Sequence, residues 1–157
     1  MADTLALARD GPYGGNGGSA YDLRDNEHKI KHIDAWEAKW QNYDVIGALR
    51  FRFDNGDLSN RVGGKDPNTN YYLKSFDFED NEGIKEMTVY AGNNEGFLNG
   101  FKFRTTHNRD WKVGGTEGHP FPVKNLGKKG EWAGATGRDG IHGADAVVDS
   151  AILYFKE

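Results

Sequence analysis

Carboxylates and histidines are the side chains here that could do chemistry, and we first ask whether their spacing fits a catalytic or metal-binding pattern. The 157-residue sequence has 24 acidic residues, five histidines and no cysteine. A glycosidase needs two carboxylates in a cleft, one with a raised pKa, and no pair stands out. The acidic turns 54–57 and 77–82 lack the spacing of a calcium loop, and His28 and His32, four residues apart, would suit zinc only on a helix. We therefore expect no catalysis, no metal and no cofactor.

Paired glycines flanked by apolar and aromatic residues are the most informative feature of the chain. The pairs are Gly14-Gly15, Gly63-Gly64 and Gly114-Gly115, so successive pairs lie 49 and 51 residues apart. A period of this size indicates three similar supersecondary units that close on each other. Residues 5–8 and 151–155 would pair as neighbouring strands, so that the two ends of the chain complete one unit.

Strand signals fill the regions between the glycine turns. Apolar and charged residues alternate in segments 49–53, 76–78 and 101–103, which is typical of strands with one buried face. Residues 34–41 would suit a short helix, but they would equally suit a strand with an irregularity. Large β-forming apolar residues, with aromatic residues at 13%, favour turn-rich β structure over disorder.

The composition limits the number of domains and the kinds of partner. The chain is expected to form a single domain over residues 1–157, with Trp111 and Trp132 in its core. The net charge is −4 and charges of both signs are interspersed, so the sequence shows no cluster of positive charge that would bind nucleic acid. No apolar run is long enough for a membrane helix, and the first residues lack the layout of a signal peptide. We expect a cytoplasmic protein, or one released without a signal, that neither binds nucleic acid nor inserts into a membrane.

Three parts of the sequence resemble signatures of the jacalin-related lectins. They are residues 11–22 (GPYGGNGGSAYD), residues 98–106 followed by 114–121, and residues 137–140 followed by an aspartate and a closing Leu-Tyr-Phe strand. Together they cover nearly the whole chain in the order of the family. The resemblance implies an all-β fold, a β-prism of three four-stranded Greek-key sheets with pseudo-threefold symmetry. A β-trefoil also has a threefold period, but its repeats are shorter and its Gln-x-Trp signature is absent.

The resemblance also implies a carbohydrate site beside the first glycine turn. The family binds sugars with a C-terminal Gly-x-x-x-Asp loop, whose carboxylate accepts hydrogen bonds from vicinal hydroxyls while backbone N–H groups donate to them. Glycine lets the backbone approach closely enough. Asp149 then takes the acceptor role. The backbone donors would be Gly17, Gly18, Asp145, Ala146, Val147 and Val148.

The C-terminal segment departs from the family pattern. Eight residues separate Gly140 from Asp149, where the family has three. We therefore expect residues 141–148 to form a longer loop, in which Asp145 competes with Asp149 for the acceptor role. His142 is expected to be an exposed loop residue rather than a ligand contact. We expect the altered loop to affect the identity of the bound sugar more than the ability to bind a sugar.

Pseudo-symmetry predicts a second carbohydrate site in the middle of the chain. Asp44 precedes its strand much as Asp149 precedes the closing strand. The site would consist of Tyr43, Asp44, Gly63, Gly64 and Lys65. Trp40 stands where the motif has glycine, so the alternative is that Asp44 is simply a turn residue. In the third copy Gly96 falls at the matching position, and no full third site is expected.

The sugar class also follows from the resemblance. Galactose-binding members use a free N-terminal glycine made by cleavage, whereas ten residues precede Gly11 here, so we expect mannose- or glucose-type glycans or glycoproteins as partners. One shallow site should bind a monosaccharide on the order of millimolar, and avidity would come from several sites or from a homodimer. The alternative from another class is a structural or protein-interaction prism without sugar binding, which the lengthened C-terminal segment favours.

Overall fold

The protein is built from strands joined by turns. The computed structural model describes residues 7–40, 42–92, 96–141 and 144–157, of which 140, 141 and 144–146 are described by their backbone alone. Among the described residues there is no helix long and apolar enough to cross a membrane. The first six strands are β1 (Leu7–Gly14), β2 (Ser19–Asp22), β3 (Ile30–Trp40), β4 (Tyr43–Phe53), β5 (Val62–Gly63) and β6 (Tyr72–Asp77). The other six are β7 (Ile84–Ala91), β8 (Leu98–Thr105), β9 (Asp110–Gly114), β10 (His119–Pro122), β11 (Trp132–Ile141) and β12 (Ala144–Lys156).

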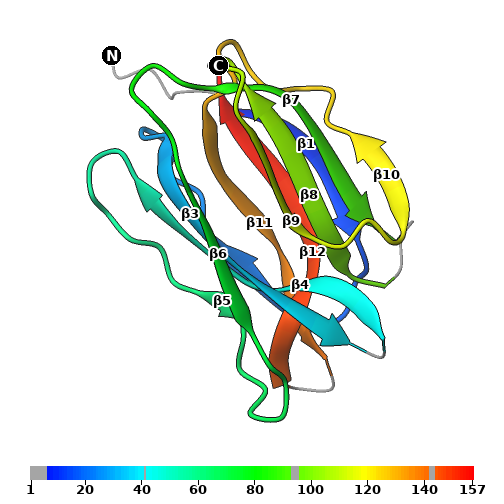
Figure 1. The fold of residues 1–157 in the computed structure, drawn as a ribbon. Coiled ribbons are helices and arrows are strands. Elements are labelled where there is room, and N and C mark those ends of the chain that lie inside the picture. Colours follow the sequence, from blue (N-terminus) through cyan, green and yellow to red (C-terminus); the bar gives the residue numbers. More distant parts are fainter. Residues whose placement is uncertain (1–6, 41, 93–95, 142–143) are drawn as a thin grey trace.

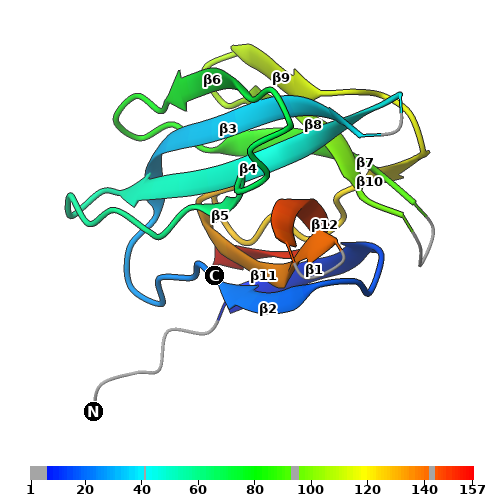
Figure 2. The same cartoon turned by 90° about the horizontal axis from the view of Figure 1, so that it is seen from below.

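The strands form three four-stranded sheets that enclose one interior. The first sheet has the order β1-β12-β11-β2, the second β5-β4-β3-β6 and the third β10-β7-β8-β9. Every pairing between neighbouring strands is antiparallel. Seen along the prism, the sheets are its three walls (Figure 2). The β-prism predicted from the glycine period and the family resemblance is confirmed.

The two ends of the chain meet in the first sheet. Leu7 pairs with Lys156 and Ala8 with Phe155, so β1 lies along β12, as their blue and red ribbons show (Figure 1). The expected pairing of the terminal segments is thus confirmed for the residues that the structure describes. It makes the first sheet a non-local unit that forms only when both ends are present.

Residues 34–40, for which helix and strand were both open, belong to strand β3. The strand pairs with β4 and β6, and its register with β4 shifts between Trp36 and Glu37. Ile33 and Ala35 are fully buried beneath the sheet. The segment is extended because β3 is a central strand. Its two neighbours form hydrogen bonds with its backbone N–H and C=O groups, and its inward side chains fill the core.

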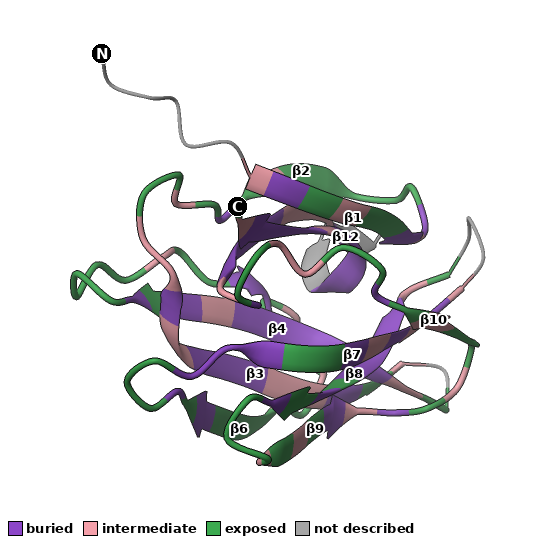
Figure 3. Ribbon diagram, turned by 90° about the horizontal axis from the view of Figure 1, so that it is seen from above, coloured by how far each residue is buried: buried purple, intermediate pink, exposed green. Residues whose placement is uncertain are grey.

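Aromatic side chains fill the axis of the prism. Trp132 is buried and contacts Phe51 and Phe101 edge to face, with ring centroids 5.0 and 5.6 Å apart. Trp111 is half-buried and packs against Phe103 at 5.6 Å. Buried residues run along much of β3 and β4 (Figure 3), with residues 45–49 of β4 buried without interruption. The placement of Trp132 in the core is therefore confirmed, whereas Trp111 lies at the edge of the core and is only partly buried.

The C-terminal segment differs from the expected long loop. Ile141 already pairs with Ala144, where β12 begins. One step along β11, from Arg138 to Asp139, is matched by two steps along β12, and the next two steps are matched by four. The extra residues are absorbed as bulges, which add residues to one strand without ending the ladder. The loop predicted over 141–148 is thus wrong at residue 141 and from residue 144 onward, residues 142 and 143 lie outside the described residues, and Asp149 lies inside β12 rather than at its start.

Candidate functional site

The first glycine turn packs directly on the backbone of Asp149. Gly14 has a φ of +102°, and a Cβ there would overlap the carbonyl oxygen of Asp149. The N–H of Gly15 donates a hydrogen bond to the same oxygen at 3.0 Å. Because only glycine tolerates both the backbone conformation and the close approach, the sequence at this turn is dictated by its contact with β12.

Arg138, on β11, holds the far side of the same turn. Its guanidinium donates to the carbonyl oxygen of Gly17 at 3.3 Å and to that of Gly18 at 2.6 Å. Both glycines are exposed, so their backbone is accessible to a ligand. The start of the turn therefore contacts Asp149 on β12, and its exposed end contacts Arg138 on β11. That Gly17, Gly18 and Asp149 act together on a sugar stays a prediction. The role of Arg138 was missed, although it stands within the family signature at residues 137–140.

The carboxyl group of Asp149 is buried at this junction. The residue is 3% exposed, and Oδ1 has no hydrogen-bond partner among the described residues. Burial, and then the negative charge of Asp139, raise the pKa of Asp149 from 3.8 to about 6, against the opposing charge of Arg138. An unpaired buried oxygen costs about 1–3 kcal/mol. A hydroxyl that donated to Oδ1 would remove this cost.

Asp139 connects this region to the second glycine turn. It is buried, and its Oδ2 accepts a hydrogen bond from the N–H of Gly63 at 2.8 Å. The contact joins β11 of the first sheet to β5 of the second. No local feature of the sequence singles out Asp139, because its partner lies 76 residues away.

The other residues expected at the first site have different surroundings. Val147 and Val148 are both fully buried. Val147 belongs to a small apolar cluster with Ala38 and Val45. The described part of Asp145 and Ala146 is their backbone in β12, and His142 lies outside the described residues.

Asp44 contacts the third glycine turn. Its N–H donates to Glu117 Oε1 at 2.6 Å, and its own Oδ1 accepts from Lys39 Nζ at 2.9 Å. A Cβ on Gly115 would lie 2.5 Å from the Cβ of Asp44. These contacts join Asp44 to the third glycine turn, and not to the second glycine turn with which it was expected to form a site.

The three glycine turns reveal which positions are structurally equivalent. A Cβ on Gly14 would overlap the carbonyl oxygen of Asp149, one on Gly63 that of Gly47, and one on Gly114 that of Asn99. The counterparts of Asp149 are therefore Gly47 and Asn99, and the predicted equivalence with Asp44 and Gly96 is wrong. Counting from the strand start misled the alignment, because the bulged start of β12 places Asp149 well inside its strand.

A polar groove does lie beside Asp44. It has a volume of about 490 Å³ and is lined by Lys39 and Asp44, by residues 68–70 of the β5–β6 loop and by Tyr72, which is 64% exposed. Tyr43 is also exposed, at the start of β4, and Lys65 is exposed in the loop that follows β5. Carboxylate, amide and aromatic groups thus surround one hollow, away from Gly63.

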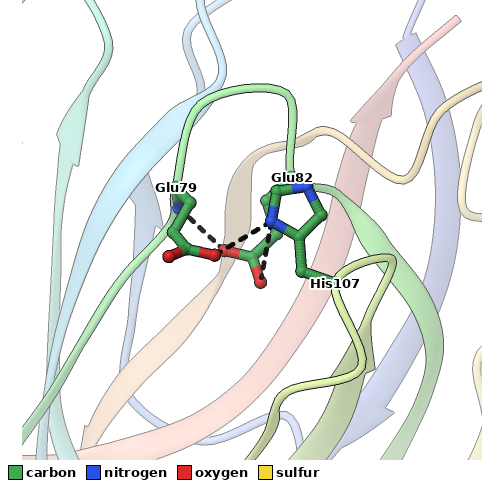
Figure 4. A group of neighbouring side chains, drawn as sticks. All are labelled: Glu79, Glu82 and His107. Carbon is green, nitrogen blue, oxygen red and sulfur yellow. Dashed lines mark hydrogen bonds and ion pairs between the residues drawn. The ribbon is translucent and has the colours of Figure 1, made fainter.

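A separate acidic group lies in the loops at the other end of the prism. One ligand atom each from Glu79, Glu82 and His107 lie within 4.8 Å of one another (Figure 4). His107 Nδ1 is 2.9 Å from Glu79 Oε1. Taken alone, these three side chains have the donor types of a metal site.

The surroundings of Glu82 satisfy its carboxylate without a metal. Arg109 Nε and the Thr105 hydroxyl both donate to Oε2, at 2.9 and 2.5 Å, and the backbone N–H of Glu79 donates to Oε1 at 2.7 Å. Burial opposes ionisation, but the Arg109 and Thr105 hydrogen bonds outweigh it and lower the pKa of Glu82 from 4.5 to about 2. The guanidinium already provides the positive charge, so this group joins two loops rather than forming a metal site.

Comparisons with known proteins agree with the prism. The sequence model of the jacalin-like lectin domain matches residues 10–147. A mannose-specific jacalin-related lectin from Morus nigra, in complex with mannose, superposes with a TM-score of 0.73 at 22% identity, covering 100% of this chain and 99% of that one. The Calsepa lectin in complex with a bisected glycan gives a TM-score of 0.71 at 25% identity, covering 97% and 99%.

One similar structure belongs to a longer chain. The lamprey immune protein gives a TM-score of 0.73 at 21% identity and covers 100% of this chain, which spans 46% of the lamprey chain. No curated protein sequence matches significantly.

Proposed function

Because the chain belongs to the jacalin-like lectin domain family, we propose that it binds glycans without catalysis, at the end of the first sheet. The observation that carries this proposal is the junction between the first glycine turn and Asp149. There the turn packs on the backbone of Asp149 through Gly14 and Gly15, Gly17 and Gly18 are exposed, and the buried carboxylate of Asp149 has an Oδ1 without a partner among the described residues. A sugar offers vicinal hydroxyls that both donate and accept, which such a junction can match.

The two parts of the junction would act differently on a sugar. The glycine turn is held in place by the N–H of Gly15 and by Arg138, so its exposed backbone is ordered before a ligand arrives. Ordering a site in advance reduces the entropy lost on binding. Asp149 would serve a hydroxyl that penetrates between the turn and β12, where a hydrogen bond to a desolvated carboxylate is strong.

We propose mannose- or glucose-type sugars as the ligands. Support comes from the similar structures, which include the mannose-specific Morus nigra lectin in complex with mannose and a mannose-binding lectin from champedak. The groove beside Asp44 is the candidate second site, with Tyr72 as a platform for a sugar face and Asn68 and Asn70 as polar contacts. Two sites on one chain would increase avidity for a branched glycan or glycoprotein.

One observation favours a second candidate function, a prism that binds proteins and not sugars. Val147 and Val148 are fully buried and Asp149 is 3% exposed, so side chains of the predicted sugar-binding segment pack into the fold. If that packing does not open, only the glycine turn remains for a sugar. The prism would then present its sheets to a protein partner.

A glycan array followed by mannose titration tests the proposal. The variants are Asp149→Asn, which keeps the size of the side chain and removes its charge, and Asp44→Ala. Asp80→Asn is the matched control, because its side chain is 98% exposed in the β6–β7 loop. We expect Asp149→Asn to abolish mannose binding, Asp44→Ala to reduce the number of sites and Asp80→Asn to bind as the wild type. If the folded wild-type protein binds no glycan, the glycan-binding proposal fails and the protein-binding prism is the remaining candidate function.

A further inference from the structure

The outer face of the third sheet carries a groove that is separate from the site described above. It has a volume of about 710 Å³, crosses β7, β8 and β9, and is bounded by Pro122 at the end of β10 and by Val123 and Leu126 after it. Ligand sites in proteins commonly measure roughly 300–1,000 Å³. The groove is therefore large enough for a ligand of several sugar rings or a comparable polymer segment.

Positive charge is concentrated along this groove. The charged side chains that line it are Lys85, Lys102, Arg104 and Lys112, against Glu86 and Asp110. Arg104 Nη1 lies 3.7 Å from Asp110 Oδ1, so its charge is matched. Within the part of the chain that the structure describes, none of the three lysines makes an ion pair. This local excess stands out in a protein whose net charge is −4.

The register of the sheet brings the lysines together. Lys102 on β8 pairs directly with Lys112 on β9, and both side chains are exposed, so two long cationic side chains leave the outer face from opposite positions. Lys74, on β6 of the second sheet, donates a hydrogen bond to the carbonyl oxygen of Lys112 and adds a further ammonium group at this edge. Like charges directly opposite each other destabilise an antiparallel pair. An anion that accepts from both ammonium groups would relieve that repulsion.

From this arrangement we propose that the outer face of the third sheet binds an anionic glycan, a polysaccharide with sulfate or carboxylate groups. Lys102 and Lys112 would share one anionic group, because their side chains leave neighbouring strands at the same register. Lys85, on β7, would bind a second group farther along the groove. Charges spread over three strands suit a polymer better than a single small anion, and the partly exposed Thr88 side chain, which lines the groove, offers a hydroxyl to the sugar.

The aromatic residues near the groove argue against single-stranded nucleic acid. Such ligands are usually bound by stacking their bases on exposed aromatic rings. Trp111 lines the groove but is half-buried against the aromatic core, and the Lys102 Nζ lies 5.9 Å from the centroid of the Tyr90 ring. The groove thus offers cations and a hydroxyl without a fully exposed aromatic ring for stacking. This site goes beyond the mannose-type function and does not depend on it.

Binding to immobilised heparin, measured at low and at physiological salt, tests the proposal. The test variant is Lys102→Gln/Lys112→Gln. The control is Arg9→Gln/Arg52→Gln, which removes the same charge from exposed positions on the first and second sheets. We expect the test variant to bind heparin about 10- to 30-fold more weakly, with a shallower salt dependence, because each lysine near a dense anionic surface contributes about one factor of five. The control should bind as the wild type.

Further measurements distinguish loss of heparin binding at the groove from loss of mannose binding at the first glycine turn. Mannose binding is measured on the same variants, and heparin binding on Asp149→Asn, so that loss at one site is not mistaken for loss at the other. Retained binding to desulfated heparin would support recognition of carboxylates, and its loss recognition of sulfates. The proposal is overturned if the wild type ignores heparin at low salt, if the control variant loses as much affinity, or if single-stranded DNA of equal charge binds as tightly. Thermal melting confirms that each variant is folded.

Discussion

Glu82 and Asp149 are both buried carboxylates, at opposite ends of the prism, and their surroundings differ sharply. Glu82 is 2% exposed and Asp149 is 3% exposed. Both oxygens of Glu82 accept hydrogen bonds, chiefly from Arg109 and Thr105, whereas Oδ1 of Asp149 has no partner among the described residues. The pKa of Glu82 is lowered to about 2 and that of Asp149 is raised to about 6.

The contrast shows that burial alone does not decide what a carboxylate does. Desolvation disfavours the charged form of both carboxylates. The hydrogen-bond donors around each group decide whether the ionised form is nevertheless stabilised. A carboxylate with its donors in place stabilises the fold. One without them costs stability, and such a cost is typical of a position retained for binding.

The largest expected effect comes from removing the charge that is well paired. Glu82→Gln should lower the free energy of unfolding by about 2–3 kcal/mol, because it removes the buried and closer of the two carboxylates that pair with Arg109. Urea denaturation measures this change. Glu79→Gln is the control, since the Glu79 side chain is 59% exposed, and it should cost less than about 1 kcal/mol. Equal losses in both variants would contradict the special role of Glu82.

Removing the unpaired charge should have the opposite sign. Asp149→Asn is expected to raise the free energy of unfolding at pH 7 by about 1–2 kcal/mol, because the folded state no longer holds a buried, unpartnered anion. Urea denaturation and mannose titration on the same preparation test the trade-off. Greater stability together with lost binding is the expected result. A destabilised variant would show that the carboxylate is paired in solution.

The pH dependence of stability sharpens the same comparison. The pKa of Asp149 is raised from 3.8 to about 6 in the folded state, so the penalty for its charge is fully present above pH 6 and falls away as the pH drops toward 3.8. The pKa of Glu82 is lowered from 4.5 to about 2, so its contribution is present above pH 4.5 and is lost as the pH falls toward 2. Thermal melting between pH 7 and 5 should therefore show a gain in the wild type that is smaller in Asp149→Asn.

The smallest effect is expected at Arg138. Arg138→Met keeps an unbranched side chain similar to the aliphatic part of arginine but removes the hydrogen bonds to Gly17 and Gly18. Stability should fall by about 1 kcal/mol, and mannose affinity by about fivefold, because the turn is no longer held in advance. Arg52→Met, which removes an arginine bond to the carbonyl of Gly56 in an exposed turn, should leave mannose binding unchanged in the same titration.

Much of the fold could be predicted from residues close together in sequence. The period of the glycine pairs and the alternation in 49–53 and 101–103 indicate three strand-rich units, because turn geometry and strand burial follow from local residue types. The segment 34–41 remained ambiguous because short apolar patterns fit either helix or strand. Its pairing on both sides, with β4 and β6, decided the matter.

The candidate site was only partly predictable. The first glycine turn and Asp149 could be placed together through the family motif. The equivalence drawn between Asp149 and Asp44 failed, because bulges in β12 change the count from the strand start without leaving a clear mark in the sequence.

What the sequence by itself determined is the architecture, three sheets joined by glycine turns, because the positive φ angles and the alternating apolar faces are local requirements. Only the tertiary structure decided the electrostatic state of each carboxylate. The contacts of Glu82 with Arg109, of Asp139 with Gly63 and of Asp44 with Glu117 join distant parts of the chain. Burial and donors depend on what folds against a side chain, so identical carboxylates end as a structural link at one end of the prism and as a candidate sugar acceptor at the other.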